Sequence, residues 1–122
     1  MISIVDDDES LREAMKSLVR SIGYRAAAFG SAEEFLDSGR VGDTSCLITD
    51  IQMPGLSGLE LQARLTAEGS DVPVIFVTAL REENIRERAA KGGAFGFFQK
   101  PFQEEKLVDC VGRALEHGPR SG

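Results

Sequence analysis

The chain has 122 residues, enough for one domain with a single hydrophobic core, and hydrophobic residues make up 42% of it. The net charge of −6 argues against a nucleic-acid-binding surface. No apolar run approaches the roughly 20 residues that a membrane-spanning helix requires, so the sequence does not predict a membrane protein.

The two cysteines bear on the cellular compartment. Cys46 falls in a predicted strand and Cys110 on the apolar face of a predicted helix, so both are interpreted as small core residues and not as a disulfide. The sequence also opens without the basic and apolar segments of a secretory signal. We therefore expect a protein of the reducing cytoplasm.

The amino-terminal half of the sequence alternates predicted strands and helices. Residues 2–5 form an apolar run that leads into four consecutive acids, and apolar residues then recur at helical spacing until Gly23. A weaker strand is predicted at 24–29. Ser31 and Glu34, three residues apart, match a helix capping box and predict a short helix.

The carboxyl-terminal half continues this alternation. The predicted strands here are residues 46–48, 72–77 and 94–99. The predicted helices carry their apolar residues at positions 59, 61 and 65, at positions 85, 89 and 90, and from position 107 to 115. The second of these helices, over 82–91, is otherwise almost wholly charged, so it should pack weakly on its sheet.

Five strands, each followed by a helix, predict an α/β fold. The expected architecture is a doubly wound five-stranded parallel sheet of the flavodoxin-like order 2-1-3-4-5, with helices on both faces. In that order the first and third strands lie side by side at the switch point, and ligands bind beyond the carboxyl ends of the strands.

Polar residues stand at the carboxyl ends of four of these strands. The strand at 46–48 leads to Asp50, and the other three lead to Asp6 and Asp7, to Thr78 and to Lys100. Each residue alone has an ordinary structural explanation, such as a helix cap or a strand end. All of them together at one edge of the sheet favour a functional site.

The residue types at this edge indicate phosphoryl chemistry. Three clustered carboxylates repel one another and need a cation, and a hard dication such as Mg²⁺ prefers oxygen ligands. Lys100 adds a positive charge and Thr78 a hydroxyl donor, and both suit a phosphoryl group. With the charge neutralised, Asp50 becomes a carboxylate nucleophile that can form an aspartyl-phosphate.

Four motifs at these positions resemble those of a known family. They are Val5-Asp6-Asp7-Asp8, Asp50-Ile51-Gln52-Met53-Pro54-Gly55, Val77-Thr78-Ala79 and Lys100-Pro101-Phe102. In this order and at these intervals, the chain resembles the CheY-like receiver domain of two-component response regulators along essentially its whole length. The helix start Ser-Ala-Glu-Glu-Phe-Leu and the run Gln-Lys-Pro-Phe-Gln-Glu-Glu-Lys-Leu look most like the FixJ subgroup.

The resemblance implies a phosphorelay function. Asp50 would accept a phosphoryl group from a histidine kinase or a histidine phosphotransfer protein, while Thr78 and Lys100 would hold the phosphate oxygens. The ligands implied for Mg²⁺, or for Mn²⁺ in its place, are Asp7, Asp50, the backbone carbonyl of Gln52, and Asp6 through water. The chain would be a signalling domain and not an enzyme beyond its own phosphorylation and dephosphorylation. The Lys100–Pro101 bond would be cis.

The resemblance further implies a route from Asp50 to an output surface. Thr78 and the aromatic residue at position 97 would form the switch. Phe97 lacks the hydroxyl of the tyrosine that is common there, so its inward position should be favoured even before phosphorylation. The output face would combine the helix at 82–91, the fifth strand and the last helix, and would serve a homodimer or an effector contact.

The same resemblance predicts the domain boundaries. The receiver domain would span residues 1–117, and residues 118–122 would form a short tail or the start of a linker. A DNA-binding effector domain would follow that linker in a longer chain. The receiver domain itself would bind neither nucleic acid nor a membrane.

Two other kinds of protein compete with this interpretation. A phosphatase of the haloacid-dehalogenase type also uses an aspartyl-phosphate and Mg²⁺, and Asp6-Asp7-Asp8-Glu9-Ser10 loosely imitates its nucleophile motif. This chain has no room for the cap domain of such an enzyme, and the phosphorylated residue would then be Asp6. A flavodoxin would need a first loop rich in Ser, Thr and Gly, where this chain has four acids.

Overall fold

The structure of the protein is a computed structural model, and residues 1–116 of it are described. None of the helices in that range is both long and apolar enough to cross a membrane. The strands are β1 (Ile2–Val5), β2 (Ala26–Phe29), β3 (Cys46–Thr49), β4 (Val74–Thr78) and β5 (Gly96–Gln99). The helices are α1 (Glu9–Ser21), α2 (Ala32–Asp37), the 3₁₀ helix η1 (Val41–Asp43), α3 (Gly58–Ala67), α4 (Glu83–Lys91) and α5 (Glu104–Glu116). The tail predicted at 118–122 lies outside the described residues.

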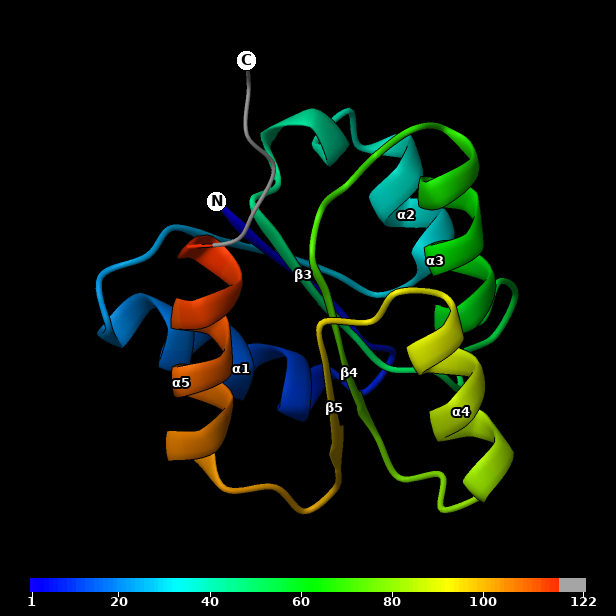
Figure 1. Cartoon of the computed structure of the whole chain (residues 1–122). Helices are drawn as coiled ribbons and strands as arrows, with labels where there is room; N and C mark the ends of the chain where they lie inside the picture. The colour runs from blue at the N-terminus through cyan, green and yellow to red at the C-terminus, as the bar shows by residue number, and fades with distance from the viewer. Residues whose placement is uncertain (117–122) are drawn as a thin grey trace.

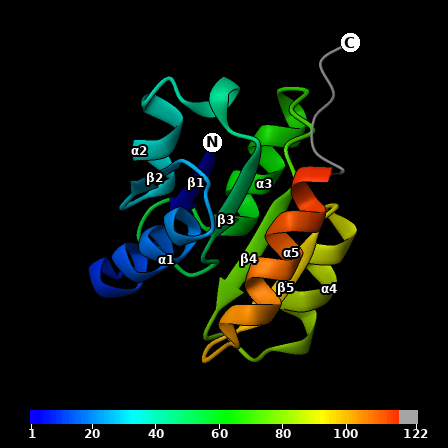
Figure 2. The same cartoon turned by 90° about the vertical axis from the view of Figure 1, so that its left-hand side faces the viewer.

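The strands form one parallel sheet in the order β2-β1-β3-β4-β5, which confirms the predicted doubly wound fold. Helices α1 and α5 cover one face of the sheet, and α2, α3 and α4 cover the other (Figure 1). Figure 2 shows the first face, with α1 and α5 toward the viewer. Each face has its own apolar core: Leu47 and Phe76 point into one, Ile48 and Ile75 into the other.

Three strands begin later than their apolar runs predicted. β2, β4 and β5 each start two residues further along the chain, at positions 26, 74 and 96. At β4, Val72 is buried but precedes the ladder, and the Pro73 carbonyl accepts the first bond, from the Leu47 amide. Burial of the chain therefore begins before strand pairing at β4, whereas Tyr24 and Arg25 ahead of β2 are exposed.

The predicted capping box at Ser31 is only half formed. The Ser31 hydroxyl accepts a hydrogen bond from the Glu34 amide, but the Glu34 carboxylate binds the Gly30 amide instead of that of Ser31. A complete capping box occurs at the start of α3, between Ser57 and Glu60. That box fixes where α3 begins, directly after the loop that follows Asp50.

Helix α4 is anchored even more weakly than its sequence predicted. Ile85 and Ala89 are buried, whereas Ala90 is exposed to solvent. A hydrogen bond from the Gln62 side chain of α3 to the Ala89 carbonyl adds a polar contact near the end of the helix. Ile85 and Ala89 thus anchor α4 in the core, and the Gln62 bond ties the end of the helix to α3.

Candidate functional site

The register of β1 and β3 brings two acids to the same edge of the sheet. Val5 pairs with Thr49, so Asp6 and Asp50 follow at the same level. The Asp50 amide donates to the Val5 carbonyl over 3.0 Å, and the Asp6 amide donates to the Phe29 carbonyl over 3.1 Å. The backbone ladder thus places both carboxylates where the strands end.

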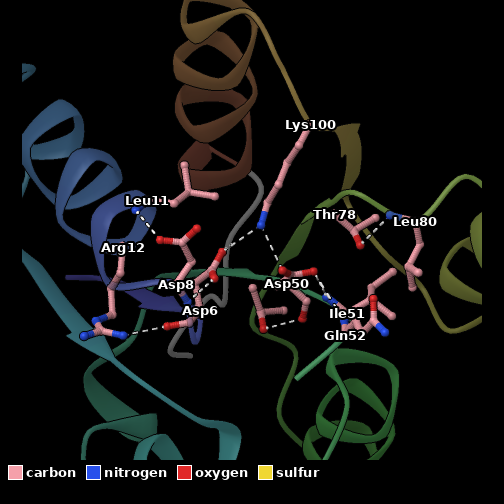
Figure 3. A network of polar contacts seen from close by, with 11 residues as sticks. Asp6, Asp8, Leu11, Arg12, Asp50, Ile51, Gln52, Thr78, Leu80 and Lys100 are labelled. Atoms are coloured by element: carbon pink, nitrogen blue, oxygen red, sulfur yellow. Dashed lines mark hydrogen bonds and ion pairs between the residues drawn. The ribbon is translucent and has the colours of Figure 1, made fainter. Parts of the chain in front are cut away.

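Lys100 reaches both of these carboxylates from the end of β5. Its Nζ lies 2.9 Å from Asp50 Oδ2 and 3.2 Å from Asp6 Oδ2 (Figure 3). The Lys100 amide donates to the Thr78 carbonyl over 2.8 Å, which extends the β4–β5 ladder by one bond. The peptide bond between Lys100 and Pro101 is cis, as the resemblance implied.

Burial and charge act together on the protonation of this cluster. Burial raises the pKa of Asp6, and the Asp50 charge adds to this, while the Asp8 amide and Lys100 oppose it. Burial alone would lower the pKa of Lys100, but the hydrogen bonds and charges of Asp50 and Asp6 outweigh it and raise that pKa. The lysine is therefore held as a cation between the two acids.

The two oxygens of Asp50 have different partners. Oδ1 accepts the Ile51 amide over 2.6 Å and the Gln52 amide over 3.3 Å. Oδ2 faces Lys100. One oxygen is therefore fixed by the loop backbone, and the other lies beside a positive charge. The Asp50 residue is 7% exposed. This arrangement orients Asp50 without covering it completely.

Asp7 completes an acidic cluster suited to a metal ion. Carboxylate oxygens of Asp6, Asp7 and Asp50 all lie within 4.8 Å of one another, and Asp7 is exposed to solvent. Hard oxygen donors at such spacing suit a dication that keeps several waters. Gln52 lies in the same loop, and the hydrogen bond from its backbone amide to Asp50 Oδ1 places its backbone at the edge of the cluster.

The two residues predicted to form the switch have partners outside this cluster. Thr78 is fully buried, and its hydroxyl oxygen accepts the Leu80 amide over 3.2 Å (Figure 3). Phe97 is partly buried against the core on the α4 side of the sheet, and the guanidinium of Arg86 lies 5.5 Å from the centre of its ring. The ring is thus covered from outside by a cation–π contact with α4.

Three residues that the sequence did not single out support the loops around the site. Arg12 donates to the Asp6 carbonyl over 2.9 Å, and Arg81 donates to the Lys100 carbonyl over 3.3 Å. Glu33 of α2 accepts the Leu56 amide over 2.9 Å, and this bond lowers the pKa of Glu33. All three are charged residues on solvated segments, which carry no pattern that would reveal a backbone partner.

The chain matches the family model described as response regulator receiver domain over residues 2–112. It is 44% identical over 121 residues to response regulator protein TmoT of Ectopseudomonas mendocina, with 98% of this chain and 54% of that protein covered. It is 42% identical over 116 residues to nodulation protein W of Bradyrhizobium diazoefficiens, with 95% and 51% covered. The crystal structure of FixJ-N matches with a TM-score of 0.88 and 31% identity, over 98% of this chain and 96% of that one.

The chain spans about half the length of the curated relatives it matches. Those relatives therefore contain about as much sequence again outside the matched part. The similarity to FixJ-N agrees with the two sequence runs that look most like the FixJ subgroup.

Proposed function

Because this chain belongs to the family of response regulator receiver domains, we propose that Asp50 accepts a phosphoryl group from a histidine kinase or a histidine phosphotransfer protein. One observation carries the proposal: Asp50 Oδ2 lies 2.9 Å from the Lys100 ammonium and beside Asp6, at the open edge of the sheet. Among the four strand ends, Asp50 is the acid that contacts the lysine most closely and remains partly accessible.

The proposed reaction is a single phosphoryl transfer. A bond forms from an Asp50 oxygen to phosphorus as the bond from phosphorus to the donor's histidine nitrogen breaks, and the electron pair leaves with the imidazole. The Lys100 ammonium neutralises charge on the transferred oxygens, and the Thr78 hydroxyl donates to one of them. The protein modifies only itself, so it acts as a signalling domain and not as an enzyme on other substrates.

The acidic cluster fits Mg²⁺, with Mn²⁺ as a substitute, because its donors are hard oxygens at suitable spacing. The residues that would hold the ion are Asp7, Asp50, the backbone carbonyl of Gln52, and Asp6 through water. When bound, the ion supplies positive charge that offsets the carboxylates and the phosphoryl oxygens. Without the ion, the single positive charge of Lys100 faces the carboxylates of Asp6 and Asp50, and exposed Asp7 adds a third carboxylate.

A small phosphodonor tests the acceptor and the ion together. With acetyl phosphate and Mg²⁺, intact mass spectrometry should show one added phosphoryl group, and peptide mapping should place it on Asp50. Chelation of Mg²⁺, or the Asp7→Ala substitution, should suppress the labelling. An exposed acid such as Asp43 offers a matched control, because Asp43→Ala removes the same charge far from the cluster. Label found on Asp6 would instead support the phosphatase interpretation.

The phosphoryl group is proposed to act on α4 through Thr78 and Phe97. The Thr78 hydroxyl would give up the bond that it accepts from the Leu80 amide and donate a new bond to a phosphoryl oxygen. Phe97 would then move further inward. That movement breaks the contact of the ring with Arg86, so α4 would shift on its two buried residues. The altered surface of α4, β5 and α5 would then serve a homodimer or an effector domain in a longer chain, within the cytoplasm.

Amide hydrogen exchange tests this relay. Addition of beryllofluoride, a phosphoryl mimic, should change the protection of residues 82–99 as well as that of the loop after Asp50, because α4 is weakly anchored. The Arg86→Gln substitution should raise exchange in α4 before any activation, whereas Arg64→Gln on the exposed face of α3 should not. Changes confined to the Asp50 loop would contradict the proposed route.

A further inference from the structure

A hollow at the end of the sheet where β1 and β2 begin is lined by three arginines. The pocket has a volume of about 490 Å³. Arg20 comes from the last turn of α1, Arg25 directly precedes β2, and Arg40 precedes η1. Tyr24, a residue that is 37% exposed, also lines the pocket. Three arginines from different segments of the chain thus line one pocket.

None of these arginines has a carboxylate partner at ion-pair distance among residues 1–116. No acid of that range lines the pocket either. Arg64 and Arg113, by contrast, pair with Glu68 and Asp109 one helical turn away. The pocket is therefore a positive region on a protein whose net charge is −6.

The position of the arginines is only partly explained by the fold. A cation at the carboxyl end of α1 is favoured by the helix dipole, which accounts for Arg20. Arg25 and Arg40 have no such role, and Nη1 of the Arg40 guanidinium lies 3.9 Å from the neutral sulfur of Met1. Since like charges repel one another, gathering three of them without an acid favours an external anion at this place.

We propose that this pocket binds a compact polyanion, a small molecule that carries several phosphate or carboxylate groups. Guanidinium groups remain charged and present paired donors that match both of these groups. The ring of Tyr24, an exposed residue, offers an apolar surface to the body of such a ligand. The net charge of −6 on the whole chain disfavours general anion binding, so we expect the probes to bind chiefly at the pocket.

The pocket is separate from the proposed phosphorylation site. The four residues of β1 lead from the pocket to Asp6, a length of roughly 13 Å at the usual rise per strand residue. The ligand therefore does not compete with a phosphoryl group on Asp50. Anion binding at the pocket and phosphorylation of Asp50 can therefore be tested independently.

Titration of the full chain, followed by amide chemical shifts, tests this site. Pyrophosphate and citrate are added in separate titrations, without Mg²⁺, and each should shift the amides of residues 20–26 and residue 40. The Arg25→Gln and Arg40→Gln substitutions should each weaken binding by about tenfold, since each removes charged hydrogen bonds. The Arg113→Gln substitution removes the same charge from α5 and should leave the affinity unchanged, as should Asp50→Asn.

The result for each probe decides the chemistry. Binding of pyrophosphate alone supports a phosphorylated ligand, binding of citrate alone supports a carboxylate ligand, and binding of both supports charge as the shared feature. Weakening with added salt is expected in each case, because the Debye length falls from roughly 30 Å at 0.01 M to about 8 Å at 0.15 M. The proposal is overturned if neither probe shifts these amides at about 10 mM, a concentration tenfold above a weak Kd of about 1 mM. Shifts centred elsewhere, or unchanged binding by both pocket variants, overturn it equally.

Discussion

Replacing Lys100 with alanine should slow the phosphorylation of Asp50 by acetyl phosphate about 10²- to 10³-fold, the usual cost of removing one group that stabilises charge in a transition state. The Lys100 ammonium lies within hydrogen-bond distance of both Asp50 and Asp6, so it is placed to meet the oxygens of an incoming phosphoryl group. The rate is measured from the time course of mass labelling at fixed Mg²⁺ and phosphodonor.

The Lys106→Ala substitution is the control for this experiment. Lys106 is an exposed residue of α5, and its removal changes the net charge by the same amount without touching the acidic cluster. Near-ultraviolet circular dichroism should show that both variants remain folded. Labelling of Lys100→Ala at the rate of the parent protein would show that the lysine has no part in the transfer.

Gly58→Ala should destabilise the protein by about 3 kcal/mol, the upper end of the usual cost of overpacking. A Cβ at position 58 would collide with the Asp50 carbonyl oxygen and the Ile51 Cα, and both are backbone atoms that cannot turn aside. The Gly58 amide also donates to the Ile51 carbonyl, so the clash would disturb the loop that carries Asp50. Thermal unfolding should show a midpoint lower by roughly 10–15 °C.

Gly112→Ala makes the same chemical change with the opposite expected sign. Gly112 lies inside α5 and a Cβ there would meet no atom within 4 Å. Alanine should stabilise the helix by about 0.5–1 kcal/mol, because glycine loses more backbone freedom on folding. If the two variants unfolded at the same temperature, close approach of α3 to Asp50 would not be what requires glycine at position 58.

The sequence was sufficient to predict the residues that meet at the edge of the sheet. Parallel strands in a known order end at one side, so an acid or a lysine that follows each apolar run must come close to the others. This is why Asp6, Asp50 and Lys100 were predicted together and are found in contact. The prediction needed only the order of strands and their ends.

Contacts made by long side chains from helices were not predictable in this way. Arg12 and Glu33 lie on solvated helix surfaces, and their backbone partners are fixed by how α1 and α2 pack, which short-range patterns do not encode. The same holds for the arginine-lined pocket, whose members lie in three segments. Ala90 shows a related limit, because one step along a helix turns a residue by about 100° and moves it from core to solvent.

The thin anchor of α4 also bears on how proteins of this kind diversify. Of its nine residues, Ile85 and Ala89 are buried and Arg86 contacts the Phe97 ring, so the other six can be exchanged with little effect on the core. The edge that carries Asp6, Asp50 and Lys100 has no such freedom, because each of those side chains contacts another. Successive mutations can therefore give α4 a new partner while the chemistry at the edge of the sheet is inherited unchanged.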